Sequence, residues 1–80
     1  MSNADTLDNR LKELRARLDL TQEELAQRVG VTRQTIIANE GKRHDPSALL
    51  ALTIAEVFGL PLEEVFWLKN KAERGNASGS

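Results

Sequence analysis

Residues 33 to 38 carry side chains that can contact the edges of nucleic-acid bases. Arg33 can pair with O6 and N7 of guanine, and Gln34 can pair with N6 and N7 of adenine. Thr35 and Ala38 can meet the methyl group of thymine. Ile37 has two open interpretations, which are a thymine-methyl contact and packing beneath the segment that follows. These residue types predict base reading, although Arg33 is equally suited to a phosphate.

Four further residues are candidates for contact with a sugar-phosphate backbone. Gln22 stands at the start of a predicted helix, where its amide and free backbone N–H groups can hold one phosphate oxygen. Thr32 stands at the start of the next helix, and Lys42 and Arg43 follow that helix with two positive charges. Such contacts add salt-dependent affinity without sequence information. The alternative interpretation makes these residues solvated surface positions.

Two consecutive helices are predicted to position these side chains. Thr21 can cap a helix over residues 22–29, and Gly30 can supply the left-handed residue that ends it. Thr32 can cap a second helix over residues 33–40. Two helices joined by a short turn with Gly form a helix-turn-helix, whose second helix lies in the major groove of DNA. A plain helical hairpin is the alternative, and charged pairs would be expected on its outer face.

The chain resembles the lambda-repressor-like, Xre/Cro-type family of helix-turn-helix regulators, in particular its small stand-alone prokaryotic members. The resemblance rests on residues 10–15, 20–26, 30–36, 45–47 and 60–66. It implies a compact five-helix, all-α DNA-binding domain whose third helix reads double-stranded DNA. It also implies that Gln22 clamps a phosphate and that the loop with Lys42 and Arg43 follows the sugar-phosphate backbone.

The chain departs from this family pattern at the end of the reading helix. Asn39 stands where the family usually has Ile or Leu facing the core, and a buried amide must find hydrogen-bond partners. Gly41 comes one residue earlier than the usual loop glycine, which would stand at the position of Lys42. We expect Asn39 to bond to backbone in the loop 41–46. These departures concern the geometry of the loop and leave the fold class unchanged.

Composition excludes several classes of function. The chain has 80 residues, no cysteine and a single histidine, so we expect one domain without disulfides, metal or other cofactors. No apolar run reaches the ~20 residues of a membrane span, and no secretory pattern opens the chain. We therefore expect a cytoplasmic protein without a membrane partner or a small-molecule ligand. No set of side chains suggests an enzyme.

Charge is distributed unevenly along the chain, although the net charge is only −1. Residues 10–43 hold eight Lys and Arg against five Asp and Glu, a balance of +3. Residues 44–68 hold four acidic residues and no Lys or Arg, a balance of −4. Binding responds to the local field within a Debye length of about 10 Å, so the basic part is the expected DNA-binding part.

The predicted organisation is one domain with two different ends. Residues 1–5 are expected to be a disordered N-terminus or tag remnant, residues 6–68 the domain, and residues 69–80 a polar flexible tail. Five helices are expected, with no strand. They cover residues 6–18, 22–29, 33–40, about 48–58, and a short stretch around residues 62–66.

Large apolar residues near the end of the domain suggest a dimer interface. Val65, Trp67 and Leu68 are the candidates, because one small core cannot bury every member of this run. The alternative for Trp67 is packing against the first helix of its own chain. We therefore expect a sequence-specific regulator that acts as a homodimeric repressor on a palindromic operator. An antitoxin that also represses its own operon, and a protein-interaction adaptor, are the alternative functions.

Overall fold

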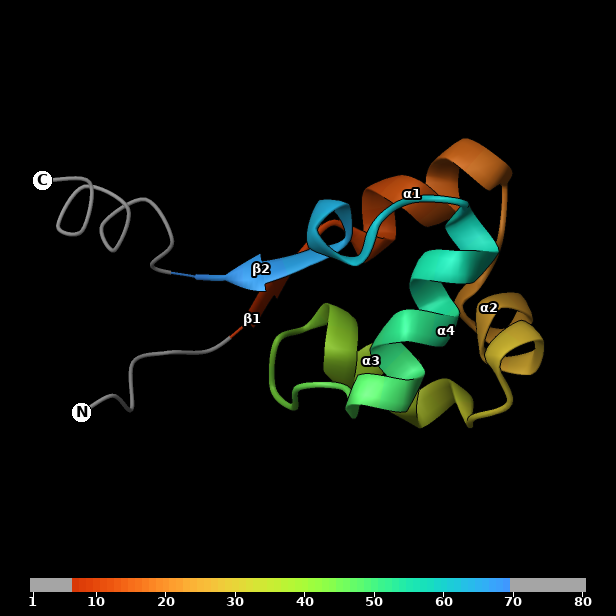
Figure 1. Ribbon diagram of the computed structural model, residues 1–80. Helices are drawn as coiled ribbons and strands as arrows, with labels where there is room; N and C mark the ends of the chain where they lie inside the picture. The colour runs from red at the N-terminus through yellow and green to blue at the C-terminus, as the bar shows by residue number, and fades with distance from the viewer. Residues whose placement is uncertain (1–6, 70–80) are drawn as a thin grey trace, which may run out of the picture.

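The computed structural model describes residues 7–69, so the expectations for residues 1–5 and for most of the tail lie outside the described residues. Figure 1 shows helices at the centre and right, and a two-stranded ribbon at the left. The elements in chain order are β1 (Leu7–Asn9), α1 (Leu11–Leu18), α2 (Gln22–Val29), α3 (Arg33–Glu40), α4 (Ala48–Phe58), the 3₁₀ turn η1 (Leu62–Glu64) and β2 (Phe66–Leu68).

Local sequence signals determine where α2 and α3 begin and end. The Thr21 hydroxyl accepts a hydrogen bond from the Glu24 N–H at 3.0 Å, and Glu24 Oε1 accepts one from the Thr21 N–H at 2.8 Å. This capping box satisfies two backbone donors at the start of α2. Gly30 ends α2 in the left-handed conformation, with φ of 79°. Thr32 accepts from the Thr35 N–H and begins α3, so the predicted bounds of both helices are confirmed.

The prediction of an all-α, five-helix domain is wrong at both ends of the domain. Residues 7–9 form β1, which pairs antiparallel with β2, with Leu7 opposite Leu68 and Asn9 opposite Phe66. The first helix therefore starts at Leu11 rather than at residue 6. The expected fifth helix is a single turn, η1, because the aromatic residues after it join the strand.

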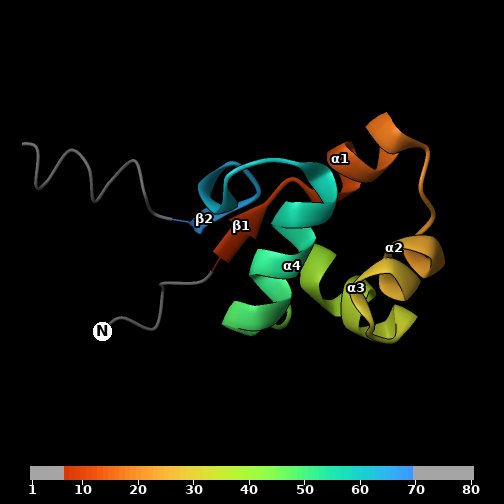
Figure 2. The same ribbon diagram turned by 45° about the vertical axis from the view of Figure 1, so that its right-hand side comes forward.

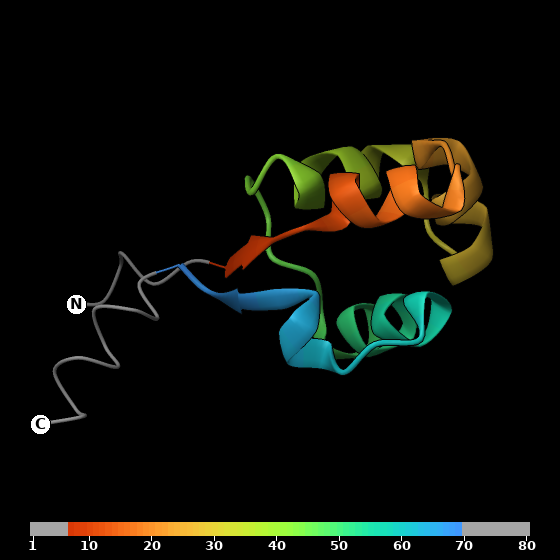
Figure 3. The ribbon, with the colours of Figure 1, turned by 90° about the horizontal axis from the view of Figure 1, so that it is seen from above.

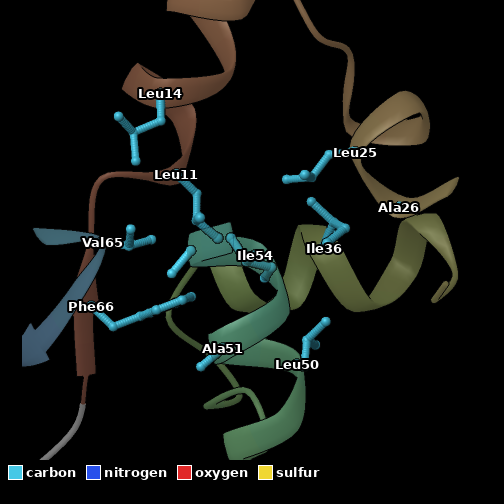
Figure 4. Close-up of a cluster of buried hydrophobic side chains, with 11 residues drawn as sticks. Leu11, Leu14, Leu25, Ala26, Ile36, Leu50, Ala51, Ile54, Val65 and Phe66 are labelled. Carbon is cyan, nitrogen blue, oxygen red and sulfur yellow. The ribbon is translucent and has the colours of Figure 1, made fainter. Parts of the chain in front are cut away.

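The hydrophobic core draws on every helix. Figure 4 shows Leu11, Leu25, Ile36 and Ile54 pointing toward one another from α1, α2, α3 and α4. Val65 and Phe66 close the core from the side of the ribbon. Because Val65 is 0% exposed, its side chain has no surface to offer a second chain, and its assignment to a dimer interface is wrong.

The arrangement separates two groups of elements. Seen from above, α1, α2 and α3 lie on one side, and α4 with η1 and β2 lies on the other (Figure 3). Figure 2 shows α2 and α3 side by side, away from the β1–β2 ribbon. The α3–α4 loop returns toward that ribbon (Figure 1). None of the helices described is long and apolar enough to cross a membrane.

Candidate nucleic-acid interface

The outward side of α3 presents the predicted base-reading residues. Arg33 and Gln34 are exposed, and Thr35, Ile37 and Ala38 are partly buried. Opposite to them, Ile36 is fully buried and anchors the helix to the core. This division leaves the polar side chains free to contact another molecule while the helix keeps its place.

A groove of about 660 Å³ runs between α3 and the start of α4. Gln34, Thr35 and Ala38 line it from α3, and Arg43 and His44 line it from the loop. The groove therefore joins three predicted base-reading residues to one predicted phosphate-binding residue. Ile37 is partly buried and does not line the groove.

Gln22 belongs to a network that ties three helices together. Its Nε2 donates to Glu40 Oε1 at 3.2 Å, and Arg15 Nη2 donates to the same oxygen at 3.2 Å. Arg15 Nε also donates to Glu40 Oε2, and Arg15 Nη1 donates to the Leu20 carbonyl at 2.8 Å. The Gln22 amide is thus oriented, and its second N–H hydrogen stays available for a phosphate oxygen.

The sequence analysis did not identify the pairing of Glu40 with Arg15. The Arg15 and Glu40 side chains are only 15% and 9% exposed, so their ion pair is screened less than a surface pair. The two residues stand 25 positions apart in the sequence, and no local pattern connects them. Only the packing of α1 against the end of α3 brings them together.

The loop after α3 keeps a left-handed residue even though its glycine is shifted. Lys42 adopts φ of 62°, whereas Gly41 has φ of −80°, which any residue can adopt. The Arg43 N–H donates to the Ala38 carbonyl at 3.0 Å, so the loop folds back onto the last turn of α3. The side chain of Arg43, a predicted phosphate-binding residue, is exposed.

Asn39 makes the backbone hydrogen bond that its position requires. Its Nδ2 donates to the His44 carbonyl at 2.9 Å, as expected for a bond to the loop 41–46. The residue is 3% exposed, and Oδ1 has no hydrogen-bond partner among residues 7–69. The side chain therefore closes the loop while one of its two polar atoms stays unsatisfied.

Strand β1 holds the α3–α4 loop at three points, which the sequence did not indicate. Each of its three residues contacts a different part of the segment from the end of α3 to the start of α4. The Leu7 N–H donates to Asp45 Oδ1 at 3.3 Å, Lys42 Nζ donates to Asp8 Oδ1 at 2.8 Å, and Asn9 Nδ2 donates to the Asn39 carbonyl at 2.9 Å. The predicted phosphate-binding Lys42 is therefore already paired within its own chain.

The remaining dimer candidates lie at the ribbon. The Arg10 guanidinium carbon is 5.4 Å from the centre of the half-buried Trp67 ring, a cation–π contact at the start of α1. Leu68 is 40% exposed. Leu49 and Leu52 on α4 are more exposed than Leu68, at 77% and 55%, and the sequence analysis did not select them as interface residues.

Comparison with known proteins defines the class. A helix-turn-helix family model matches residues 11–65. An uncharacterized HTH-type transcriptional regulator of Bacillus subtilis, YgzD, is 49% identical over 65 residues, which cover 81% of this chain and 98% of YgzD. Another uncharacterized HTH-type transcriptional regulator, from Methanocaldococcus jannaschii, is 52% identical over 60 residues, covering 75% of this chain and 91% of the relative.

A solved structure supports the same fold. The crystal structure of a candidate DNA-binding protein from Bacteroides fragilis superposes with a TM-score of 0.68 at 23% identity, covering 76% of this chain and 98% of the other. The chain belongs to the helix-turn-helix family of the lambda-repressor-like, Xre type. Its relatives are HTH-type transcriptional regulators, so the class is that of DNA-binding regulators.

Proposed function

We propose that the protein is a sequence-specific repressor that places α3 in the major groove of double-stranded DNA. The observation that carries this proposal is the exposed face of α3 with Arg33 and Gln34, held against the core by Ile36. Gln34 and Arg33 would pair with base edges, and Thr35 and Ala38 would contact thymine methyl groups. By occupying the operator, the repressor would exclude other proteins from that stretch of DNA. It would act in the cytoplasm, where the DNA lies.

Contacts on either side of α3 support a defined register on the duplex. Gln22 lies at the start of α2, oriented by Glu40, and Arg43 lies beyond the end of α3. Phosphate contacts from Gln22, Thr32 and the loop would bracket the reading helix, since such contacts position a protein without reading sequence. The Thr32 hydroxyl already caps α3, so its phosphate contact would be additional to that bond.

We further propose that two copies bind a two-fold operator, because one short helix reads only a few base pairs. The elements α4, η1 and β2 lie on the same side of the molecule (Figure 3), and their exposed leucines would supply the apolar surface for a second copy. These residues are Leu49, Leu52, Leu62 and Leu68. This surface replaces the interface built on Val65, and Trp67 stays a candidate at its margin.

Selection from random duplex DNA tests the proposal. We expect a palindromic consensus with half-site centres about one helical turn, ~34 Å, apart. Gln34→Ala is expected to lose preference at one base-pair position in each half-site, with a loss of about 1–3 kcal/mol on the selected sequence. Enrichment of no sequence, or an unchanged consensus for Gln34→Ala, would contradict the assignment of α3 as the reading helix.

A further inference from the structure

Asp8 in β1 forms an ion pair with Lys42, whose positive charge would otherwise be free to contact DNA phosphates. We propose that Asp8 is a positioning residue that withholds the Lys42 ammonium from DNA phosphates, so that Arg43 alone provides the loop's full electrostatic contact. This inference rests on the proposed function, because it assumes that the α3–α4 loop faces the DNA backbone. It assigns to β1 a part in setting the strength of DNA binding.

The geometry of the pair is well defined. Lys42 Nζ lies 2.8 Å from Asp8 Oδ1, and the same oxygen accepts the Asn9 backbone N–H at 2.8 Å. The hydrogen bond from Lys42, followed by that from the Asn9 N–H, lowers the pKa of Asp8 below its usual value. The carboxylate is therefore ionised at neutral pH, and its charge cancels that of Lys42.

The backbone on both sides of the pair is held in place. Leu7 bonds to Asp45 and Asn9 bonds to the Asn39 carbonyl, so β1 lies against both ends of the loop. An ordinary surface ion pair contributes only about 0–1 kcal/mol, because two free side chains must be ordered to form it. The Lys42 and Asp8 side chains are 45% and 29% exposed, so the pair lies at the surface, but the strand and the loop hold its two residues opposite one another.

The neighbouring residue Arg43 provides a contrast. Arg43 is exposed, and the structure gives it no ion pair with any residue from 7 to 69, whereas Lys42 is paired. A phosphate that took the Lys42 ammonium would leave the Asp8 carboxylate unpaired beside a second anion, which like-charge repulsion opposes. A cation that is already neutralised also displaces fewer counterions from DNA.

Binding measurements at several salt concentrations test the inference. The quantity is the salt slope, which is the change in log binding constant with log salt concentration, measured on random-sequence duplexes. In the parent we expect Arg43→Gln to reduce the slope by about one and Lys42→Gln to reduce it by much less. We expect Asp8→Asn to steepen the slope by about one and to raise affinity by up to about tenfold at 0.1 M salt.

Double variants and a matched control separate this effect from a change in total charge. In a Lys42→Gln background Asp8→Asn should leave the salt slope nearly unchanged, because no cation is freed, and should raise affinity only by relieving the repulsion between the carboxylate and DNA. Asn at position 8 keeps an acceptor for the Asn9 N–H, so the ribbon should stay folded, which thermal melting checks. Glu63→Gln makes the same charge change at an exposed site in η1 and should leave the slope nearly unchanged.

Each outcome decides the question. Equal slope losses for Lys42→Gln and Arg43→Gln in the parent would overturn the inference, and this comparison does not alter β1. An Asp8→Asn protein that binds like Glu63→Gln, or more weakly than the parent, would also overturn it. Failure of the proposed function would look different, since the parent would then show no salt-dependent binding to duplex DNA.

Discussion

Asn39 combines one good hydrogen bond with one unsatisfied polar atom inside the domain. Asn39→Leu keeps the approximate size of the side chain, removes the unpaired Oδ1 and adds apolar surface to the core. The His44 carbonyl, which loses its partner, belongs to an exposed residue and can be solvated. We expect the variant to be more stable by about 1 kcal/mol in chemical unfolding. A loss of stability would mean that the Nδ2 bond outweighs the unsatisfied oxygen.

Lys42 adopts a backbone conformation that favours glycine. Lys42→Gly and Lys42→Ala both remove the ion pair with Asp8, so comparing them isolates the backbone term. At φ of 62°, alanine is strained by roughly 1–2 kcal/mol and glycine is not. Because glycine also has greater freedom in the unfolded chain, we expect Lys42→Gly to exceed Lys42→Ala by about 1 kcal/mol in unfolding free energy. Equal stability would show that the loop rearranges once the lysine is gone.

The structural roles of several single residues could be predicted from short-range sequence patterns. The capping roles of Thr21 and Thr32 and the left-handed Gly30 follow from patterns within four residues, and the structure has each of them. The left-handed conformation of Lys42 was not predictable in this way. It depends on the bond that closes the loop onto α3 and on the contacts with β1, which local sequence does not encode.

Glu40, the last residue of α3, accepts hydrogen bonds from Arg15 on α1 and Gln22 on α2. Glu40→Gln leaves the guanidinium of Arg15, which is only 15% exposed, without its charge partner. We expect a loss of about 2 kcal/mol in unfolding free energy, read from denaturant titration. Binding to DNA should also weaken after correction for folding in Glu40→Ala, which removes the acceptor that orients the Gln22 amide, whereas Glu40→Gln keeps one acceptor oxygen.

The exposed pair Arg17–Glu13 is the matched control. It lies within α1 with both side chains more than half exposed, and Glu13→Gln should change stability by less than about 0.5 kcal/mol. A similar small effect for Glu40→Gln would show that the Arg15 pair contributes no more than a surface pair.

The helices and the ribbon differ in how far they could be predicted. The bounds of α2 and α3 are as expected, because each has its own cap and apolar spacing. The pairing of residues 7–9 with 66–68 joins opposite ends of the domain, and neither segment alternates clearly enough to predict a strand. Leu7 stands at helical spacing from Leu11, so the local pattern extended the first helix too far.

The distribution of apolar surface over the molecule determines where a second copy can bind. Leu49 and Leu52 are among its most exposed large apolar residues, and their removal should leave the monomer intact. We expect Leu49→Glu and Leu52→Glu to shift the protein toward monomer in sedimentation at micromolar concentration, and to weaken operator binding. Leu18→Glu, at an exposed leucine on α1, is the control and should change neither property. Dimers that persist in both α4 variants would place the interface elsewhere.

The uneven distribution of charge along the chain follows the division of the fold into two groups of elements. The basic stretch 10–43 contains α1, α2 and α3, and the acidic stretch 44–68 contains α4, η1 and most of the exposed large apolar residues described. This polarity was predictable from sequence because it follows the order of residues along the chain. The set of residues that meets at the loop was not, since Asp8, Asn39 and Asp45 come together only in the folded domain.

Mapping the bound surface by NMR tests the central claim most directly. The amide resonances of the protein would be followed while its selected duplex is added. We predict that the largest shifts fall on residues 33–38, Gln22 and Arg43, with the exposed face of α4 unchanged at a fixed oligomeric state. Shifts concentrated on α4, η1 and β2, with α3 unaffected, would contradict the assignment of α3 as the DNA-reading helix.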